Sequence, residues 1–201
     1  MTGLRERKKR ETRLALSRAT IALIVARGWD EVSVEDIAAA ANVSERTFRN
    51  YFTSKAEAVA ASHLERALVV ADELRSWPAD EPFWPAVLAA VRSSLTTAPS
   101  SPRDAAYMER VKLVLTHPSL HAELLRADDI AKDELAVAIA ERLGLDRDGD
   151  LFPQLAASVV AAGIATAMRF WMLTDPTGSV LDVIDQVFAE IGRGLPVPEG
   201  E

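Results

Sequence analysis

The sequence contains no cysteine among its 201 residues. This absence excludes disulfide bonds, thiolate nucleophiles and cysteine-ligated zinc, and it is compatible with a reducing compartment. Aromatic residues make up only 6% of the chain, whereas hydrophobic residues make up 49% and charged residues 26%. These proportions are typical of an ordinary folded protein rather than a disordered or fibrous one.

Signals for export and for membrane insertion are also lacking. Charged residues run from Arg5 into a helical pattern without an intervening apolar segment, so we expect no secretion and a cytoplasmic protein. The most apolar stretch, residues 155–173, contains Ser158, Thr166 and Arg169. We expect it to fall short of the roughly 20 apolar residues that a membrane span needs, and to form a buried helix instead. We therefore expect no membrane partner.

Acidic charge predominates, but its distribution along the chain is uneven. The formal net charge is -7 for the whole chain, +4 for residues 1–55 and -11 for residues 56–201. Between Arg5 and Arg13 six basic residues stand against two acidic ones, an arrangement that suits phosphate groups. The alternative for such a run is a solvated helix face. Only the N-terminal part thus has the charge of a segment that binds nucleic acid.

Helix caps and helix breakers predict an all-α protein. Leu14, Ile21 and Val25 form an apolar stripe at helical spacing, and Gly28 is placed to end that helix. Beyond it, prolines, glycines and capping serines interrupt the chain at regular intervals, and no internal repeat is evident. We predict nine helices, at about residues 5–27, 34–41, 45–52, 55–77, 85–97, 102–116, 119–143, 151–173 and 179–194.

The second and third predicted helices carry the strongest functional pattern. Residues 33–36 (Ser-Val-Glu-Asp) resemble a capping box that starts a short helix. A tight turn at Asn42 and Val43 then leads to a helix that Ser44 can cap. Two short helices joined in this way after a long first helix have the shape of a helix-turn-helix, whose second helix can enter the major groove of DNA.

The third helix divides into an apolar and a polar face. Phe48 and Phe52, four residues apart, are expected to point into a small core with Ile37 and Ala38. The opposite face then presents donors and acceptors that suit base edges and phosphates. The residues on it are Glu45, Arg46, Arg49 and Asn50, with Ser44, Thr47 and Tyr51 along its edge.

Residues 39–59, with the Val-Ser turn, the aromatic end of the third helix and the following Ser-Lys in register, resemble the signature of the TetR family of bacterial regulators. The resemblance covers about residues 10–60. It implies an all-helical homodimer whose two recognition helices enter successive major grooves of a pseudo-palindromic operator. We assign DNA binding to Ser33, Ser44, Glu45, Arg46, Thr47, Arg49, Asn50, Tyr51 and Lys55.

Arg49 departs from the family pattern, in which many members have tyrosine at this position. The departure prevents any transfer of an operator sequence from the family, but an arginine would suit a bidentate contact to guanine. For Arg46 and Arg49, base contact and contact to phosphate alone both stay open, because half or more of interface hydrogen bonds go to the DNA backbone.

The rest of the chain resembles, more weakly, the C-terminal domain of actinobacterial regulators similar to the mycofactocin-system regulator. The resemblance implies an acyl-CoA or another hydrophobic effector. It depends on residues 110–120, 141–145, 150–153 and 169–171.

An effector pocket would have to form among the fourth to eighth helices. Arg110 and Arg169 are expected in apolar surroundings, where a charge needs a partner, either a carboxylate such as Asp104 or Glu109 or an anionic ligand. Aromatic residues at helical spacing fill a core more often than they line a site. With that alternative open, we assign ligand contacts to Trp84, Tyr107, Arg110, Val111 and Trp171.

The helices at about 151–173 and 179–194 are expected to form the homodimer interface. The first is apolar nearly all round, and Ala157, Ala161 and Ala165 recur every four residues, which allows close approach. A single chain has little left to cover both helices, so two copies would pack them as a two-fold four-helix bundle. Burial within one chain is the alternative.

Catalytic, metal and cofactor residues are not assigned. His117 and His121 flank a helix start at Pro118, so their rings need not share a face. Glycine-rich phosphate loops, nucleophile elbows and metalloprotease motifs do not occur. We therefore expect a ligand-responsive transcriptional regulator, with repression as the default sign, a DNA-binding domain at 1–55 and a ligand-binding and dimerisation domain at 56–201. The alternative is a helical-bundle enzyme or small-molecule carrier that does not bind DNA.

Overall fold

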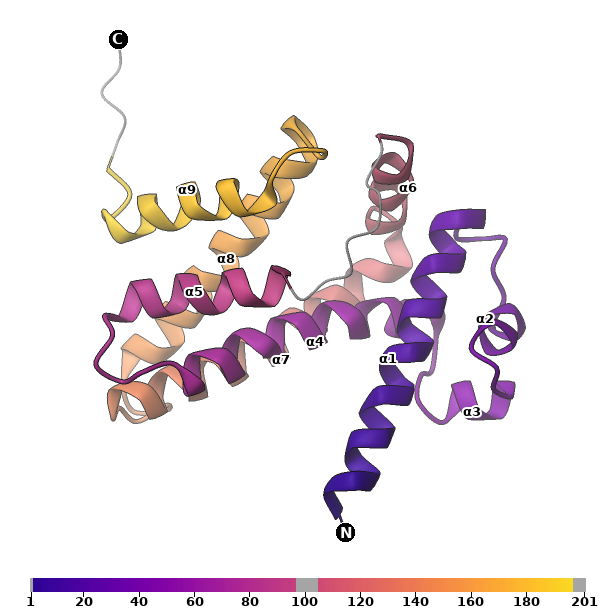
Figure 1. Ribbon diagram of the computed structural model, residues 1–201, viewed down its shortest axis with the longest axis horizontal. Coiled ribbons are helices and arrows are strands. Elements are labelled where there is room, and N and C mark those ends of the chain that lie inside the picture. The colour runs from indigo at the N-terminus through magenta and orange to yellow at the C-terminus, as the bar shows by residue number, and fades with distance from the viewer. Residues whose placement is uncertain (1, 97–104, 197–201) are drawn as a thin grey trace. The chain divides into compact units, whose positions relative to one another are not determined.

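The computed structural model describes residues 2–96 and 105–196. Within them the chain forms nine helices and no strand, so the all-α prediction is confirmed (Figure 1). The helices are α1 (Thr2–Arg27), α2 (Val34–Ala40), α3 (Glu45–Arg49), α4 (Lys55–Ser76), α5 (Phe83–Thr96), α6 (Ala105–Leu115), α7 (Pro118–Leu143), α8 (Leu151–Thr174) and α9 (Val180–Gly192).

The helix ends follow the local signals in the sequence. Gly28, with φ of 101°, ends α1, and its N–H donates to the carbonyl of Ile24 at 2.8 Å. Glycine adopts this left-handed conformation without a steric penalty. At the other end of a helix, Ser179 caps α9 by accepting from the N–H of Asp182. The expected beginning of the sixth helix at 102–104 lies outside the described residues.

The helices group into two compact units. The first contains the described residues up to 65 together with 106–127, and the second contains the described parts of 66–105 and 128–201. The grouping does not follow the order of the chain, because α6 and the beginning of α7 belong with the N-terminal helices. The long helices α4 and α7 each contribute many residues to both units.

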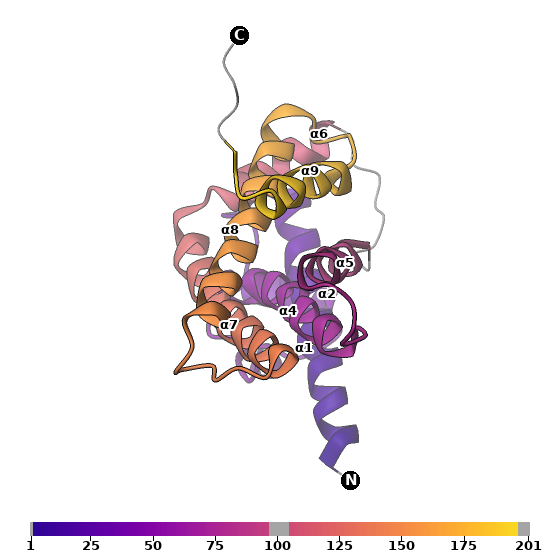
Figure 2. The ribbon, with the colours of Figure 1, turned by 90° about the vertical axis from the view of Figure 1, so that its left-hand side faces the viewer.

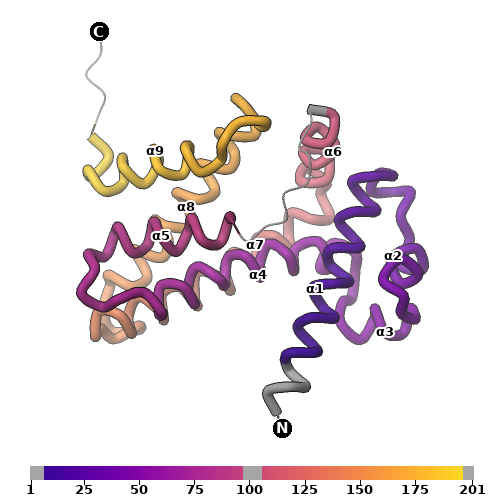
Figure 3. The backbone as a smooth tube through the Cα atoms, in the orientation of Figure 1, coloured from indigo at the N-terminus to yellow at the C-terminus, as the bar shows by residue number. Residues whose placement is uncertain are grey.

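The core of the first unit joins its N-terminal helices to α6 and α7. Leu16 and Ile24 of α1 are almost fully buried, as are Ile37 of α2 and Phe48 of α3. Val114 of α6 and Leu120 of α7 complete the cluster, and Figure 3 traces the chain through these helices. The short helices α2 and α3 thus depend on packing against longer helices, since helices of five to seven residues are not stable alone.

The core of the second unit is assembled from five helices, α4, α5, α7, α8 and α9 (Figure 2). Its fully buried side chains include Leu74, Val87, Ile139, Val160 and Ile184, one from each helix. Where α8 passes α9, a Cβ added to Gly163 would lie 2.8 Å from the Cδ1 of Ile191. The small residues of α8 therefore allow α9 of the same chain to approach closely.

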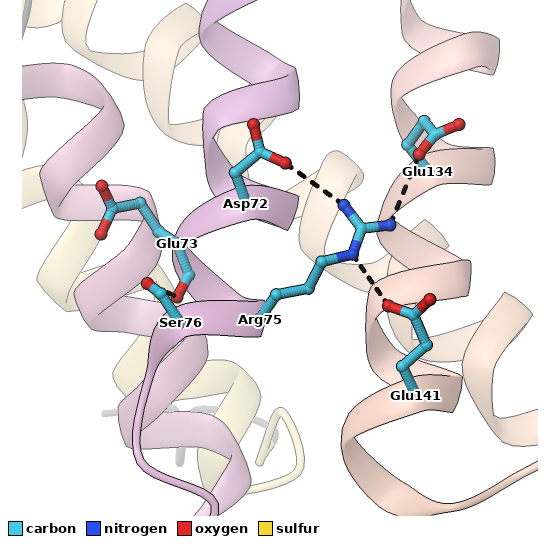
Figure 4. Close-up of polar contacts among 6 residues, drawn as sticks. All are labelled: Asp72, Glu73, Arg75, Ser76, Glu134 and Glu141. Carbon is cyan, nitrogen blue, oxygen red and sulfur yellow. Dashed lines mark hydrogen bonds and ion pairs between the residues drawn. The ribbon is translucent and has the colours of Figure 1, made fainter.

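Two arginines fasten the C-terminal end of α4 to α7 within the second unit. Arg75 lies between Asp72, Glu134 and Glu141, and its Nε donates to Glu141 at 2.8 Å (Figure 4). These carboxylates, Glu141 foremost, raise the pKa of Arg75 above its ordinary value. Arg142 donates to the carbonyls of residues 77, 78 and 81, just beyond α4. Free carbonyls at a helix end need such donors.

Two expectations about α8 need correction. The helix Leu151–Thr174 is long and apolar enough to cross a membrane by length and composition, whereas we expected it to fall short. It is not a buried helix either, because only 33% of its apolar window is buried and Leu155, Phe170 and Leu173 are exposed. One such helix is weak evidence for a membrane span, since core helices of soluble proteins pass the same test. The helix α8 thus has two apolar faces. Other helices of the same chain cover one of these faces and leave the other exposed.

Candidate nucleic-acid interface

A complete capping box starts α2. The hydroxyl of Ser33 accepts from the N–H of Asp36 at 3.1 Å, and the Asp36 carboxylate accepts from the N–H of Ser33 at 2.9 Å. The Ser33 hydroxyl, its N–H and then Arg27 hold the pKa of Asp36 below its usual value. Ser33 is exposed, but its hydroxyl and its N–H are both engaged by this box.

The turn between α2 and α3 has a fixed backbone. Asn42 has φ of 54°, a left-handed conformation that asparagine tolerates better than most residues. The N–H of Asn42 donates to the carbonyl of Ala39 at 3.0 Å, and that of Val43 donates to Ala38 at 2.9 Å. These bonds set the direction in which α3 leaves the turn.

The inner face of α3 is apolar, as predicted from the sequence. Phe48 and Phe52 are each 1% exposed, and their ring centroids lie 5.6 Å apart at a tilt of 50°. They share a buried cluster with Ile37, and Ala38 is buried as well. Ser44 caps the helix by accepting from the N–H of Thr47 at 3.1 Å, and their hydroxyls bond to one another at 2.9 Å.

The outer face of α3 carries the predicted polar residues. Glu45, Arg46, Arg49 and Asn50 are exposed, whereas Tyr51 is half-buried. Arg49 pairs with Glu45 one helical turn earlier, at 3.3 Å. The guanidinium group of Arg49 is therefore held along the helix by a carboxylate of the same helix. Of the remaining predicted residues, Ser44 is exposed and Thr47 is half-buried.

Lys55 has partners that the sequence did not indicate. Its ammonium group donates to the backbone carbonyl of Trp29 and to that of Val32, the latter at 3.1 Å. The same group lies 5.2 Å from the centroid of the Trp29 ring. Lys55 at the start of α4 thus holds the loop between α1 and α2.

Sequence comparisons agree with this geometry. Residues 16–61 match the profile of bacterial regulatory proteins of the tetR family, and residues 81–196 match that of the MftR C-terminal domain. The HTH-type transcriptional regulator TcmR of Streptomyces glaucescens is 35% identical over 181 residues, which are 87% of this chain and 79% of TcmR. The chain belongs to the TetR family.

Further relatives extend the comparison. The regulator named for mycofactocin biosynthesis, MftR of Mycobacterium tuberculosis, is 27% identical over 94% of this chain and 93% of its own length. A TetR-family structure from Mesorhizobium loti has a TM-score of 0.57 at 18% identity and covers 92% of this chain and 95% of its own. NalD of Pseudomonas aeruginosa, a repressor of a multidrug efflux pump, has a TM-score of 0.54 at 19% identity, over 92% and 96%. These structural likenesses show the fold alone.

Family membership decides between the two classes of function considered from the sequence. TetR-family proteins are transcriptional regulators that bind operator DNA, generally as dimers, and they are not enzymes. The helix-turn-helix of this TetR-family chain is formed by α2 and α3. The alternative of an enzyme or carrier without DNA binding is therefore set aside.

The residues assigned to an effector fall in both units of this TetR-family protein. Trp84 and Trp171 belong to the second unit, whereas Tyr107, Arg110 and Val111 belong to the first. Trp171 is 4% exposed, and its indole N–H donates to the carbonyl of Gly178 at 3.0 Å. It therefore has a structural role at the turn between α8 and α9.

The expected environment of two arginines is wrong. Arg110 and Arg169 are both exposed, so neither charge is buried among apolar groups and neither requires a fixed partner. Each side chain lies on a side of its helix that no other part of the described chain covers, and the hydrophobic neighbours in the sequence did not reveal this. Asp104, one suggested partner, lies outside the described residues. Glu109, the other, is exposed.

His117 also has a role that sequence reasoning missed. It lies between α6 and α7, and its ring stacks on the ring of Trp29. Its Nδ1 accepts from the N–H of Ser119 at 3.2 Å. In the sequence, a histidine directly before Pro118, which starts a helix, indicates at most a helix cap. No pattern in the sequence indicates that His117 contacts Trp29. Among the described residues no group of three His, Asp or Glu could hold a metal ion.

Proposed function

We propose that this protein is a ligand-responsive transcriptional repressor that binds a pseudo-palindromic operator as a homodimer, with α3 as its recognition helix. The single observation that supports this proposal is the division of α3 into two faces. Phe48 and Phe52 are buried, so Glu45, Arg46 and Arg49 are left on the exposed side. The protein would act in the cytoplasm, where operator DNA is found.

The exposed residues of α3 have different proposed tasks. Arg46 and Arg49 supply planar guanidinium groups that suit the O6 and N7 acceptors of guanine, and Asn50 suits adenine. Ser44, Thr47 and Tyr51 supply hydroxyls for phosphates along the edge of the helix. Ser33 supports the site chiefly by starting α2, because its hydroxyl is already engaged with Asp36. Glu45 holds Arg49 until a base replaces it.

Dimerisation is proposed to use the uncovered face of α8 together with α9. The exposed apolar side chains of α8 gather at its two ends, with Leu151, Phe152 and Leu155 at one and Phe170 and Leu173 at the other. Ala157 does not contribute to this face, because it is 1% exposed within its own chain, whereas Ala165 is exposed. Phe170→Glu should therefore yield monomers in sedimentation analysis, and Ala122→Glu on α7 should not.

The effector is proposed to be an acyl-CoA or another hydrophobic molecule. The match of residues 81–196 to the MftR C-terminal domain supports this proposal. Ligand binding would act on DNA affinity through α4, which contributes residues to both units. A changed spacing of the two recognition helices would no longer match successive major grooves. Long-chain acyl-CoA should release the duplex, whereas free coenzyme A should not.

The deciding experiment selects bound sequences from a pool of randomised duplexes. We expect the wild-type protein to enrich a pseudo-palindrome with half-site centres about 10 base pairs apart or a multiple of that. Arg49→Ala should relax the preference at one position of each half-site, by about 1–3 kcal/mol. The control is Arg126→Ala, an exposed arginine of α7. Failure of the wild-type dimer to bind any duplex at low salt would overturn the proposal.

A further inference from the structure

The beginning of α1 is a cationic segment that the helix-turn-helix does not need. The family profile matches from residue 16, and the buried core contacts of α1 start at Leu16. Residues 7–13 precede both and contain no apolar side chain. Residues 7–11 are all exposed, and Figure 3 shows them at the lower, indigo end of α1. Packing therefore gives no reason for this segment to be helical.

The C-terminal part of this segment contacts residues of the unit that contains the helix-turn-helix. Arg10 forms an ion pair with Glu65 of α4. One turn later Arg13 lies 3.8 Å from Glu57 and 5.0 Å from the centroid of the Phe52 ring. Phe52 lies between α3 and α4, so the contacts of Arg13 place this part of α1 next to the connection between those two helices. In Figure 1 this end of α1 and α3 lie at the same, lower end of the unit.

Residues 7–13 contain five basic side chains and one acidic side chain, and carboxylates of α4 pair with two of the five basic ones. The first turn of α1 contains no acidic residue, so no carboxylate there offsets the positive end of the helix dipole. Lys9 and Arg13 are like charges four residues apart, which also disfavours a helix. The pair between Arg7 and Glu11, at 3.7 Å and highly exposed, offsets little of this repulsion. A polyanion that accepts these charges would stabilise the helix.

We propose that residues 7–13 form a second DNA-binding element, an arm that contacts the phosphate backbone flanking the site read by α3. The inference rests on the proposed function, because it assumes that α3 enters a groove. Arg10 and Arg13 hold the base of the arm against α4, while Arg7, Lys8 and Lys9 meet phosphates. Duplex DNA is favoured over a lipid surface, because the arm has no apolar side chain to insert and lies next to the connection between α3 and α4.

The test uses two double variants of the full-length protein with the same net charge. Lys8→Ala with Lys9→Ala removes both lysines of the arm, and Lys112→Ala with Lys132→Ala removes two lysines from α6 and α7. The logarithm of the binding constant falls linearly with the logarithm of the salt concentration, and each phosphate contact contributes about 0.9 to this salt slope. The arm variant, which lacks two such contacts, should therefore have a salt slope that is smaller by about 1.8. When salt is raised from about 50 to 200 mM, the factor by which the arm variant loses affinity should be about ten times smaller than the factor for wild type. The α6/α7 variant should keep the wild-type slope.

The outcomes separate this inference from the proposed function. If wild type and both variants share one slope, the arm is only a solvated helix face and the inference is wrong. If no protein binds duplex at low salt, the proposed function itself fails. Vesicles containing phosphatidylglycerol provide the competing surface, and loss of vesicle binding by the arm variant with an unchanged DNA slope would also overturn the inference. Thermal unfolding should be the same for wild type and the arm variant, since neither lysine is packed.

Hydrogen exchange gives a second readout that does not depend on affinity. Amides of residues 7–13 should exchange rapidly in the protein alone and become protected on a saturating mixed-sequence duplex. In the variant lacking Lys8 and Lys9 this protection should be lost while α3 stays protected. Equal protection of the arm in wild type and variant would contradict the proposed phosphate contacts.

Discussion

The imidazole ring of His117 stacks on the indole ring of Trp29, with centroids 4.3 Å apart and an interplanar angle of 15°. The ammonium group of Lys55 lies near the same indole and bonds to the carbonyls of Trp29 and Val32. One tryptophan therefore joins the loop after α1, the start of α4 and the junction between α6 and α7. All of these lie in the unit that contains the helix-turn-helix.

His117→Ala should lower the stability of the protein by about 0.5–1.5 kcal/mol, the typical value of an aromatic pair beyond its buried area. His117→Phe should preserve most of that stability, since a phenyl ring can stack on Trp29 in the same place. Urea unfolding followed by tryptophan fluorescence measures both variants. An equal loss of stability in the two variants would mean that the junction between α6 and α7 is stabilised by the hydrogen bond from the Ser119 N–H to the His117 Nδ1 and not by the ring stack.

Lys55→Ala should have two separable effects. An ammonium group has three donors, and two of them go to the carbonyls of Trp29 and Val32, which leaves one for a phosphate. The salt slope of DNA binding should fall by about one, as expected for one phosphate contact. The free energy of unfolding should fall by roughly 1.5–3 kcal/mol, because the carbonyls lose a charged donor. Destabilisation with an unchanged slope would show that Lys55 only holds the loop.

Asp36 should make the stability of the unit that contains the helix-turn-helix depend on acid pH. Its pKa lies below the ordinary 3.8 in the folded protein, chiefly because the Ser33 hydroxyl donates to it. A carboxyl with a depressed folded pKa contributes stability above its unfolded pKa, and that contribution is lost as pH falls through the folded value. Asp36→Ala should thus be less stable than wild type near neutral pH, and the difference should shrink below pH 3.8. Unfolding temperatures recorded across this range provide the measurement.

The cluster around Arg75 should contribute modestly and in a salt-dependent way. Arg75→Ala removes contacts to Asp72, Glu134 and Glu141 at distances of 2.8–3.5 Å (Figure 4). Because the arginine side chain is partly exposed, we expect a loss of about 1 kcal/mol, which decreases at high salt. Arg193→Ala, which removes a single exposed pair with Glu190, is the matched control and should change stability less. An effect independent of salt would indicate lost packing instead.

The sequence alone determined the order of the helices and the two faces of α3, although α3 ends at Arg49 and not at the predicted residue 52. Caps such as Ser33 and Ser44 act on N–H groups within the next three residues, so their effect can be read locally. The spacing of Phe48 and Phe52 likewise fixes which side of a helix is apolar without reference to any other element. The family resemblance carried by residues 39–59 followed from the same local pattern, and the comparisons confirm it.

Only the tertiary structure decided which distant groups meet. Lys55 bonds to backbone carbonyls 23 and 26 residues away, and His117 stacks on a tryptophan 88 positions earlier in the chain. Arg110 and Arg169 proved to be exposed, because the side of a helix that faces solvent depends on which neighbours cover it. Periodicity gives the angular position of a side chain around its own helix. The partner opposite that side chain is chosen by how the helices pack, which no local pattern contains.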